Sequence, residues 1–147
     1  MRENILEETQ ELHRGEGPLV SILLPTRGRP DHLRASIDSL YSLAHDKTLF
    51  DFLLKVDSDD PATLAVATEL SAAMPVQFLV SPRRRGYHEM AGWINQLAAL
   101  ATGDWLFVWN DDARMTTAAW DQIISAVVVI DRPNWHGIDE ICLMCCT

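Results

Sequence analysis

Oxygen-bearing side chains follow two apolar segments of this chain. The first segment is FDFLLKVD at residues 50–57, and the second is WLFVW, which begins at Trp105. The side chains are Asp57, Ser58 and Asp59 for the first segment and Asn110, Asp111 and Asp112 for the second. Acidic groups that face one another repel unless a positive charge lies between them, and Mg²⁺ or Mn²⁺ takes such oxygen ligands together with phosphates. The residue types therefore indicate a divalent cation with a phosphorylated ligand.

Arginines occur in two turns of the same chain. Arg27 and Arg29 lie in the turn TRGRP, and Arg84 is the centre of the run SPRRRGY. A guanidinium pairs with phosphate oxygens through two parallel hydrogen bonds. Together with carboxylates and a metal ion, these arginines favour a nucleoside diphosphate site, in which the metal stabilises the departing diphosphate. The simpler alternatives are that the arginine run is a solvated loop and that the acidic residues cap helices or form a solvated turn.

Apolar runs and amphipathic stripes alternate along the chain. Continuous apolar runs predict strands at residues 19–25, 50–57, 76–80 and 105–110. Helices are predicted between and after them: one opened by Pro30, one capped by Asp60 before Pro61, one with a stripe from Met90 to Ala101, and one capped by Thr116 or Thr117. This alternation is typical of an α/β, Rossmann-like fold, with a mainly parallel sheet and helices on both faces.

The predicted fold places the acidic groups and one arginine turn at the same edge of the sheet. Ligands of open α/β sheets bind outside the carboxyl ends of the strands. Asp57, the segment 110–112 and the turn 26–29 each follow a predicted strand at that edge. We therefore expect these three segments, which are far apart in the sequence, to converge on one crevice.

Length and composition restrict the classes of protein further. A chain of 147 residues is expected to form one domain, residues 1–147, and its net charge of −9 argues against nucleic acid as the main partner. No apolar stretch is long enough for an integral membrane segment, and the N-terminal residues lack the apolar core of a secretory signal, so a cytoplasmic location is expected. Cys142, Cys145 and Cys146 lack a second pair at zinc-site spacing and are expected to be reduced thiols.

The order of these motifs resembles the nucleotide-binding half of GT-A fold glycosyltransferases, especially those of family 2. The matching segments are PTRGRP, KVDSDDP and ATGDWLFVWNDD, and the resemblance covers residues 19–115. It implies that 19–115 is a nucleotide-binding core and that 116–147 adds a helix and a short tail. The nucleotide-binding residues that it implies, with Arg84 added from the arginine run, are Pro25, Thr26, Arg27, Arg29, Asp57, Ser58, Asp59, Asn95 and Asp111.

The resemblance also implies a metal site and an activity. Asn110, Asp111 and Asp112 are in register with the family's DXD motif, whose last Asp binds the metal, so Asp112 is the expected metal ligand, with Asn110 beside it. The implied activity is metal-dependent transfer, with Mn²⁺ or Mg²⁺, of a sugar from a UDP- or GDP-type donor to an unknown acceptor. The alternative is a non-catalytic or truncated nucleotide-sugar-binding module that needs a partner for activity.

The sequence disfavours two other classes of α/β protein that also have their sites at the ends of strands. A receiver-like signalling domain would have a lysine at the end of its last strand, and no such strand is evident after residue 115. A Rossmann dehydrogenase would have GxGxxG where this chain has PTRGRP.

The region after the last motif is expected to be short for this family, which normally continues for about a hundred residues that supply the acceptor site. The candidates for a general base that deprotonates the acceptor are Asp139, Glu140 and His136. For the apolar tail ICLMCCT three alternatives stay open: packing on the domain, packing on a partner such as a second copy in a homo-oligomer, or a truncated product.

Overall fold

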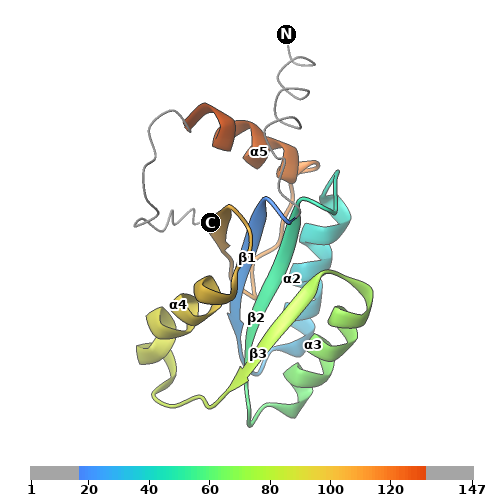
Figure 1. The fold of residues 1–147 in the computed structure, drawn as a ribbon. Helices are drawn as coiled ribbons and strands as arrows, with labels where there is room; N and C mark the ends of the chain where they lie inside the picture. The colour runs from blue at the N-terminus through green and yellow to red at the C-terminus, as the bar shows by residue number, and fades with distance from the viewer. Residues whose placement is uncertain (1–16, 132–147) are drawn as a thin grey trace.

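The computed structural model describes residues 17–131 as strands and helices in alternation. Figure 1 shows them arranged around one sheet. In chain order they are β1 (Val20–Thr26), α2 (Pro30–Leu43), β2 (Phe50–Asp57), α3 (Pro61–Ala73), β3 (Val76–Ser81), the short 3₁₀ helix η1 (Gly86–Glu89), α4 (Met90–Leu100), β4 (Trp105–Val108) and α5 (Trp120–Asp131). The predicted strand–helix alternation is confirmed.

The sheet has four strands in the order β3-β2-β1-β4, and every neighbouring pair is parallel. In register, Thr26 lies beside Val56, and Val56 lies beside Val80. β1 and β2 therefore end next to each other, and β3 ends beside β2. Since the connections cross over through helices, the carboxyl ends of the strands meet at one edge, as the sequence predicts.

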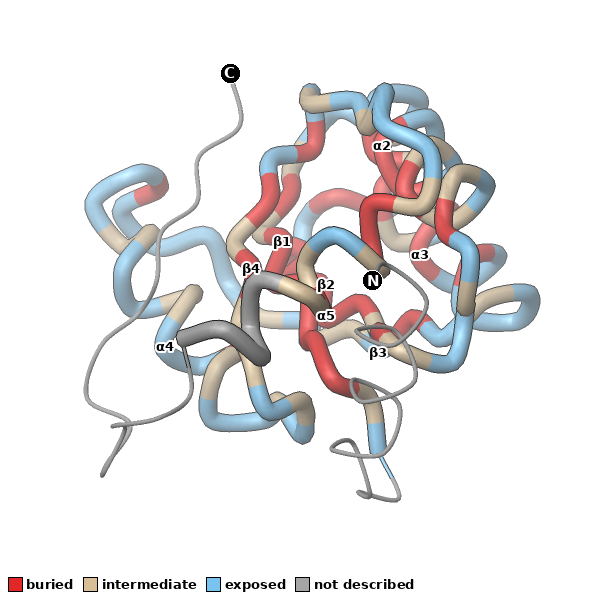
Figure 2. The backbone as a smooth tube through the Cα atoms, turned by 90° about the horizontal axis from the view of Figure 1, so that it is seen from above, coloured by how far each residue is buried: buried red, intermediate tan, exposed pale blue. Residues whose placement is uncertain are grey.

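Helices cover both faces of the sheet. In the larger core, buried residues of α2 and α3, such as Leu33 and Leu70, belong to the same cluster as Phe52 of β2. On the opposite face Leu97 of α4 packs against Leu23 and Leu53. Figure 2, seen from above, shows the buried backbone running between α4 on one side and α2 and α3 on the other. The predicted α/β fold with a parallel sheet and two helical layers is confirmed.

Local sequence signals explain where two helices begin. Pro30 occupies the start of α2, and Asp31 lies in its first turn, where a negative charge is favourable. Asp60 caps α3 by accepting a hydrogen bond from the backbone N–H of Thr63 at 3.2 Å, and Pro61 follows it. Both features match the sequence prediction.

The last helix begins later than the sequence indicates. A cap at Thr116 or Thr117 is not observed, because Ala119 has a positive φ of 54° and α5 begins only at Trp120. The N–H of Ala119 donates to the carbonyl oxygen of Leu43 at 2.8 Å, which ties this turn to the end of α2. Trp120 then packs near Phe50 and donates through its indole N–H to the carbonyl oxygen of Leu40 at 2.8 Å. Tertiary contacts therefore determine where α5 begins.

The tight fit between β1 and the start of β4 predicts one large stability effect. A Cβ at Gly103 would lie 2.6 Å from the backbone nitrogen of Ser21 and 2.9 Å from the carbonyl carbon of Val20. We therefore expect Gly103→Ala to lower the free energy of unfolding by about 1–3 kcal/mol, because the backbone must shift to make room. Gly92→Ala in α4 is the control, since the nearest atom to its Cβ is Oε2 of Glu89 at 3.9 Å. Denaturant unfolding that ranks the two variants equally would contradict this packing argument.

No helix within residues 17–131 is long and apolar enough to cross a membrane. The general-base candidates Asp139, Glu140 and His136, the three cysteines and the apolar tail lie outside the described residues.

Candidate functional site

A cavity of about 560 Å³ opens at the carboxyl edge of the sheet. It is bounded by four segments: the turn after β1, the end of β2, the loop that leads into α4 with the start of α4 itself, and the residues after β4. Its lining residues are Pro25, Thr26, Arg27, Gly28, Arg29, Lys55, Asp57, Arg83, Gly86, Tyr87, Met90, Trp93, Asn110, Asp111 and Asp112. Asp57 and the segment 110–112 therefore share one cavity, and the turn 26–29 joins them there.

Neighbouring acids fix the turn after β1. The hydroxyl of Thr26 donates to Oδ2 of Asp111 at 2.9 Å, and the N–H of Gly28 donates to Oδ2 of Asp60 at 2.6 Å. Gly28 has a positive φ of 65°, which glycine adopts without strain. Burial acts to raise the pKa of Asp60, but the hydrogen bonds from Thr63 and Gly28 outweigh it and leave the pKa below its usual value. Asp60 thus connects the cap of α3 to the wall of the cavity.

This double role predicts that Asp60 contributes more to stability than the adjacent Asp59. We expect Asp60→Ala to lower the free energy of unfolding by about 0.5–2 kcal/mol, because it removes the cap of α3 and the acceptor for the N–H of Gly28. Since the pKa of Asp60 is depressed in the folded state, this stabilisation is present above the ordinary aspartate pKa of about 4 and is lost on acidification. Asp59→Ala is the control because Asp59 is exposed and its carboxylate accepts hydrogen bonds from the side chain of Arg27. Equal losses at pH 7 would contradict the assignment.

Arg27 joins the acids that follow β2. Its Nη1 lies 2.6 Å from Oδ2 of Asp57 and 2.5 Å from Oδ1 of Asp59. Hydrogen bonds to Asp59 and Asp57 raise the pKa of Arg27 above its usual value, and the hydrogen bond from Arg27 lowers the pKa of Asp59. Arg27 and Asp59 therefore stay charged at neutral pH and reinforce each other.

Arg29 pairs with the two carboxylates that follow β4, as Arg27 does with those at the end of β2. Its Nη2 lies 3.1 Å from Oδ1 of Asp111, and its Nη1 lies 3.2 Å from Oδ2 of Asp112. Asp111 is buried, whereas the Asp112 side chain is 56% exposed. The acidic groups need a positive charge between them, and in this structure the chain's own arginines supply it.

A buried lysine completes the floor of the cavity. Lys55 is only 1% exposed, and its Nζ contacts Oδ1 of Asp57 and lies 3.9 Å from the centre of the Trp93 ring. An uncompensated ammonium group would be costly at this depth, so the carboxylate and the ring face together explain how it is accommodated. Asp57 is thereby held between Lys55 on one oxygen and Arg27 on the other.

Sequence reasoning missed Lys55 and the lining residues that η1 and α4 supply. Lys55 is two positions before Asp57, so the period of two along a strand places both side chains on the same face of β2. That spacing was a usable signal. Tyr87, Met90 and Trp93 reach the cavity through tertiary packing, which no local pattern reveals. Arg83 belongs to the arginine run that the sequence indicates as a candidate phosphate partner.

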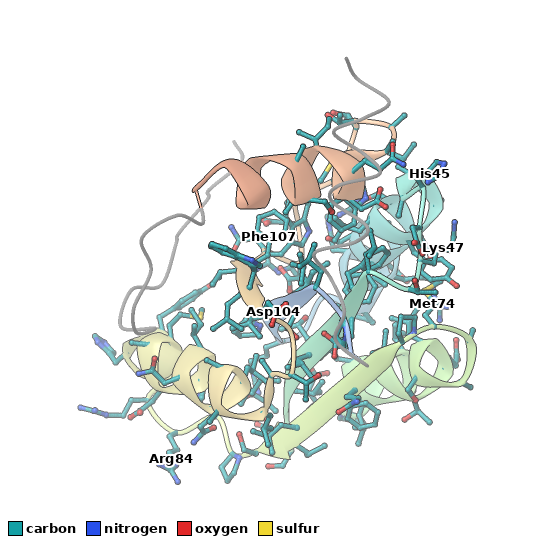
Figure 3. All side chains as sticks on the ribbon, turned by 45° about the horizontal axis from the view of Figure 1, so that its top comes forward. His45, Lys47, Met74, Arg84, Asp104 and Phe107 are labelled. Atoms are coloured by element: carbon teal, nitrogen blue, oxygen red, sulfur yellow. The ribbon has the colours of Figure 1, made fainter. Side chains whose placement is uncertain are left out.

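Four of the sequence-predicted binding residues do not line the cavity. Ser58 and Asp59 are exposed beyond β2, and only Asp59 is connected to the cavity, through Arg27. Arg84 has a positive φ of 51° and lies at the outer side of its loop, as Figure 3 shows, so its neighbour Arg83 is the one that reaches the lining. Asn95 is exposed on α4. The remaining predicted residues within 17–131 all meet at the cavity.

The donor set at the end of β4 suits a hard cation. Within residues 17–131 no three His, Cys, Asp or Glu side chains are arranged to hold a metal by themselves. Asn110 and Asp112 are exposed and carry oxygen donors, whereas both oxygens of Asp111 are engaged, by Thr26 and Arg29. Mg²⁺ commonly uses one or two carboxylates and completes its shell with water and phosphate oxygens. The residues present therefore fit a cation that is bound jointly with a diphosphate.

The family model "Glycosyl transferase family 2" matches residues 21–129, most of the chain and all of the cavity-forming segments. The chain belongs to glycosyl transferase family 2. No curated protein matches its sequence.

A solved structure with the same fold is that of a mannosyltransferase, PcManGT from Pyrobaculum calidifontis, in complex with GDP-Man and Mn²⁺. The TM-score is 0.64 at 16% sequence identity, over 89% of this chain and 40% of that one. At this identity the match establishes the fold, and it confirms the predicted GT-A class. The family 2 chain described here thus spans less than half the length of that mannosyltransferase.

Proposed function

We propose that this family 2 chain binds a nucleoside diphosphate sugar in the cavity at the carboxyl edge of the sheet and takes part in transferring the sugar to an acceptor. The observation that carries the proposal is that Asp57 and the segment 110–112 line the same cavity, together with Arg27 and Arg29. The presence of GDP-Man and Mn²⁺ in the mannosyltransferase of the same fold supports a GDP- or UDP-type donor.

The nucleoside end of the ligand belongs beside Asp57. This carboxylate accepts hydrogen bonds on both oxygens, from Lys55 and Arg27, and each oxygen has a second lone pair for a base or ribose donor. Because Lys55, which itself packs on the Trp93 ring, contacts this carboxylate, its orientation is set before the ligand arrives. Asp57 therefore orients the nucleoside, and Arg27 lies where it can move from Asp57 and Asp59 to a phosphate.

The diphosphate end belongs between Arg29 and the residues after β4. Asp112 and Asn110 are the residues that would hold Mn²⁺ or Mg²⁺, together with phosphate oxygens. When bound, the cation supplies positive charge that stabilises the departing diphosphate. Arg29 adds a guanidinium fork in the same cavity, while Asp111, held by Thr26, fixes the position of the turn that carries both arginines.

The domain organisation belongs to the same proposal. Residues 19–115 form the nucleotide-binding core of a single domain, and α5 follows as its last described element. The general base for an acceptor hydroxyl is proposed among Asp139, Glu140 and His136, which remain sequence predictions.

A thermal-shift panel of nucleoside diphosphates and their sugars, with and without Mn²⁺, tests the proposal. At a ligand concentration of 100 Kd the folded state gains about 2.7 kcal/mol, so a bound ligand raises the melting temperature measurably. We expect UDP or GDP to stabilise the protein and Mn²⁺ to increase the effect. Absence of any shift across the panel would contradict the proposal, whereas binding without donor hydrolysis or transfer would favour a binding module over an active transferase.

A further inference from the structure

Arg29 lies where a divalent cation would meet the acidic residues after β4. We infer that Arg29 competes with the cation for Asp111 and Asp112, and that a diphosphate relieves this competition by offering the guanidinium another partner. The inference rests on the proposed function, because it assigns the cation to the same site.

The contacts of Arg29 support direct competition. One guanidinium nitrogen contacts Asp111 at 3.1 Å and the other contacts Asp112 at 3.2 Å, so a single positive group bridges both carboxylates. Thr26 occupies the remaining oxygen of Asp111 at 2.9 Å. A cation that approaches Asp112 alone therefore meets a like charge within a few ångströms, and two like charges at this range repel even in water.

The side chain of Arg29 can move without any change in the fold. Its backbone carbonyl accepts a hydrogen bond from the N–H of Leu33 at 2.9 Å, and Pro30 follows it at the start of α2, so the backbone is fixed. The side chain itself is 43% exposed and forms part of the cavity lining. A diphosphate in this cavity presents oxygens that a guanidinium binds through two parallel hydrogen bonds.

Coupling between the two ligands follows from this exchange. Without a diphosphate, the cation must displace Arg29 from its carboxylates and leave the guanidinium without an anionic partner. With a diphosphate bound, Arg29 already has that partner, and Asp112 and Oδ1 of Asp111 are released for the cation. Each ligand should therefore strengthen binding of the other by the same factor, as thermodynamic linkage requires.

The test is to titrate Mn²⁺ alone into the protein and follow the free ion by electron paramagnetic resonance. We expect Arg29→Gln to bind Mn²⁺ roughly threefold to tenfold more tightly than the unmodified chain, because the substitution removes the competing charge. The same variant should bind GDP or UDP with Mn²⁺ more weakly, since it lacks the phosphate partner. Opposite changes for two ligands cannot arise from partial unfolding, and the melting temperature confirms that the variant is folded.

Arg114→Gln is the matched control. It changes the net charge by the same amount close to the same carboxylates, but the Arg114 guanidinium bonds to the carbonyl oxygens of Ala113 at 2.9 Å and Asp111 at 3.5 Å. We expect its affinity for Mn²⁺ to stay within about twofold of the unmodified chain, because only the long-range field changes. Arg29→Lys, which keeps the charge, should also bind Mn²⁺ alone weakly.

The inference is overturned if Arg29→Gln binds Mn²⁺ no more tightly than the unmodified chain, or if Arg114→Gln gains as much affinity. A gain specific to Arg29→Gln supports the competition even if no nucleoside diphosphate binds either protein. In that last case the proposed function and the relief by a diphosphate fail while the competition between Arg29 and the cation stands, so the two failures are distinguishable.

Discussion

Replacing Asp112 by alanine should remove the Mn²⁺-dependent part of nucleotide binding and leave the fold unchanged. The side chain is 56% exposed, and its contact in the described structure is Arg29 at 3.2 Å, so it contributes little to stability. As the most accessible carboxylate after β4, it is the expected metal ligand. We expect at least about a tenfold loss of Mn²⁺ affinity in the presence of GDP or UDP, which isothermal titration calorimetry would measure.

The matched control for this prediction is Asp38→Ala. Asp38 is an exposed acid on α2 that does not line the cavity, so the change in net charge is the same and the site is untouched. Equal Mn²⁺ affinity for Asp112→Ala and Asp38→Ala would show that Asp112 is not a metal ligand.

Replacing Asp57 by asparagine should have the largest effect on stability among the site residues. Asp57 and Lys55 are both 1% exposed and in contact, so the substitution leaves a buried ammonium without its carboxylate. Breaking such a pair by removing one partner costs about 3–5 kcal/mol. Nucleotide binding should be lost as well, because the carboxylate that accepts hydrogen bonds from the nucleoside is gone. Thermal unfolding and calorimetry with GDP or UDP measure the two effects.

The double variant Asp57→Asn with Lys55→Met separates stability from binding. Replacing both members of a buried ion pair is often neutral, so we expect most of the lost stability to return. Nucleotide binding should stay absent, because no carboxylate faces the cavity at this position. A double variant that is stable and binds nucleotide like the unmodified chain would disprove the role assigned to Asp57.

Much of the fold was predictable because the decisive signals are local. β1 and β2 are continuous apolar runs buried on both faces, and Pro30 and Pro61 mark the starts of α2 and α3. The late start of α5 was not predictable, because it depends on the positive φ of Ala119 and on a hydrogen bond to Leu43, which is distant in the sequence.

The site, like the fold, has some features that the sequence predicts and others that it does not. Asp57 and the segment 110–112 could be placed together because strand ends of a parallel sheet meet at one edge. Their compensation by Arg27 and Arg29 could not be predicted, because it depends on side-chain pairs formed across the fold. The pair of Lys55 and Asp57 is local to β2, and its spacing was a usable signal. Arg83 lines the cavity and Arg84 does not, which depends on the backbone of one loop, where Arg84 and Gly86 both have positive φ.

We expect Asp57 and Asp112 to contact opposite ends of one metal-bound nucleoside diphosphate. Anomalous diffraction at the manganese edge, from crystals grown with GDP and Mn²⁺, tests it most directly. The expected result is a manganese peak beside Asp112, diphosphate density next to it, and the nucleoside beside Asp57. A manganese peak and nucleotide density located away from this cavity would contradict the roles assigned to Asp57 and Asp112.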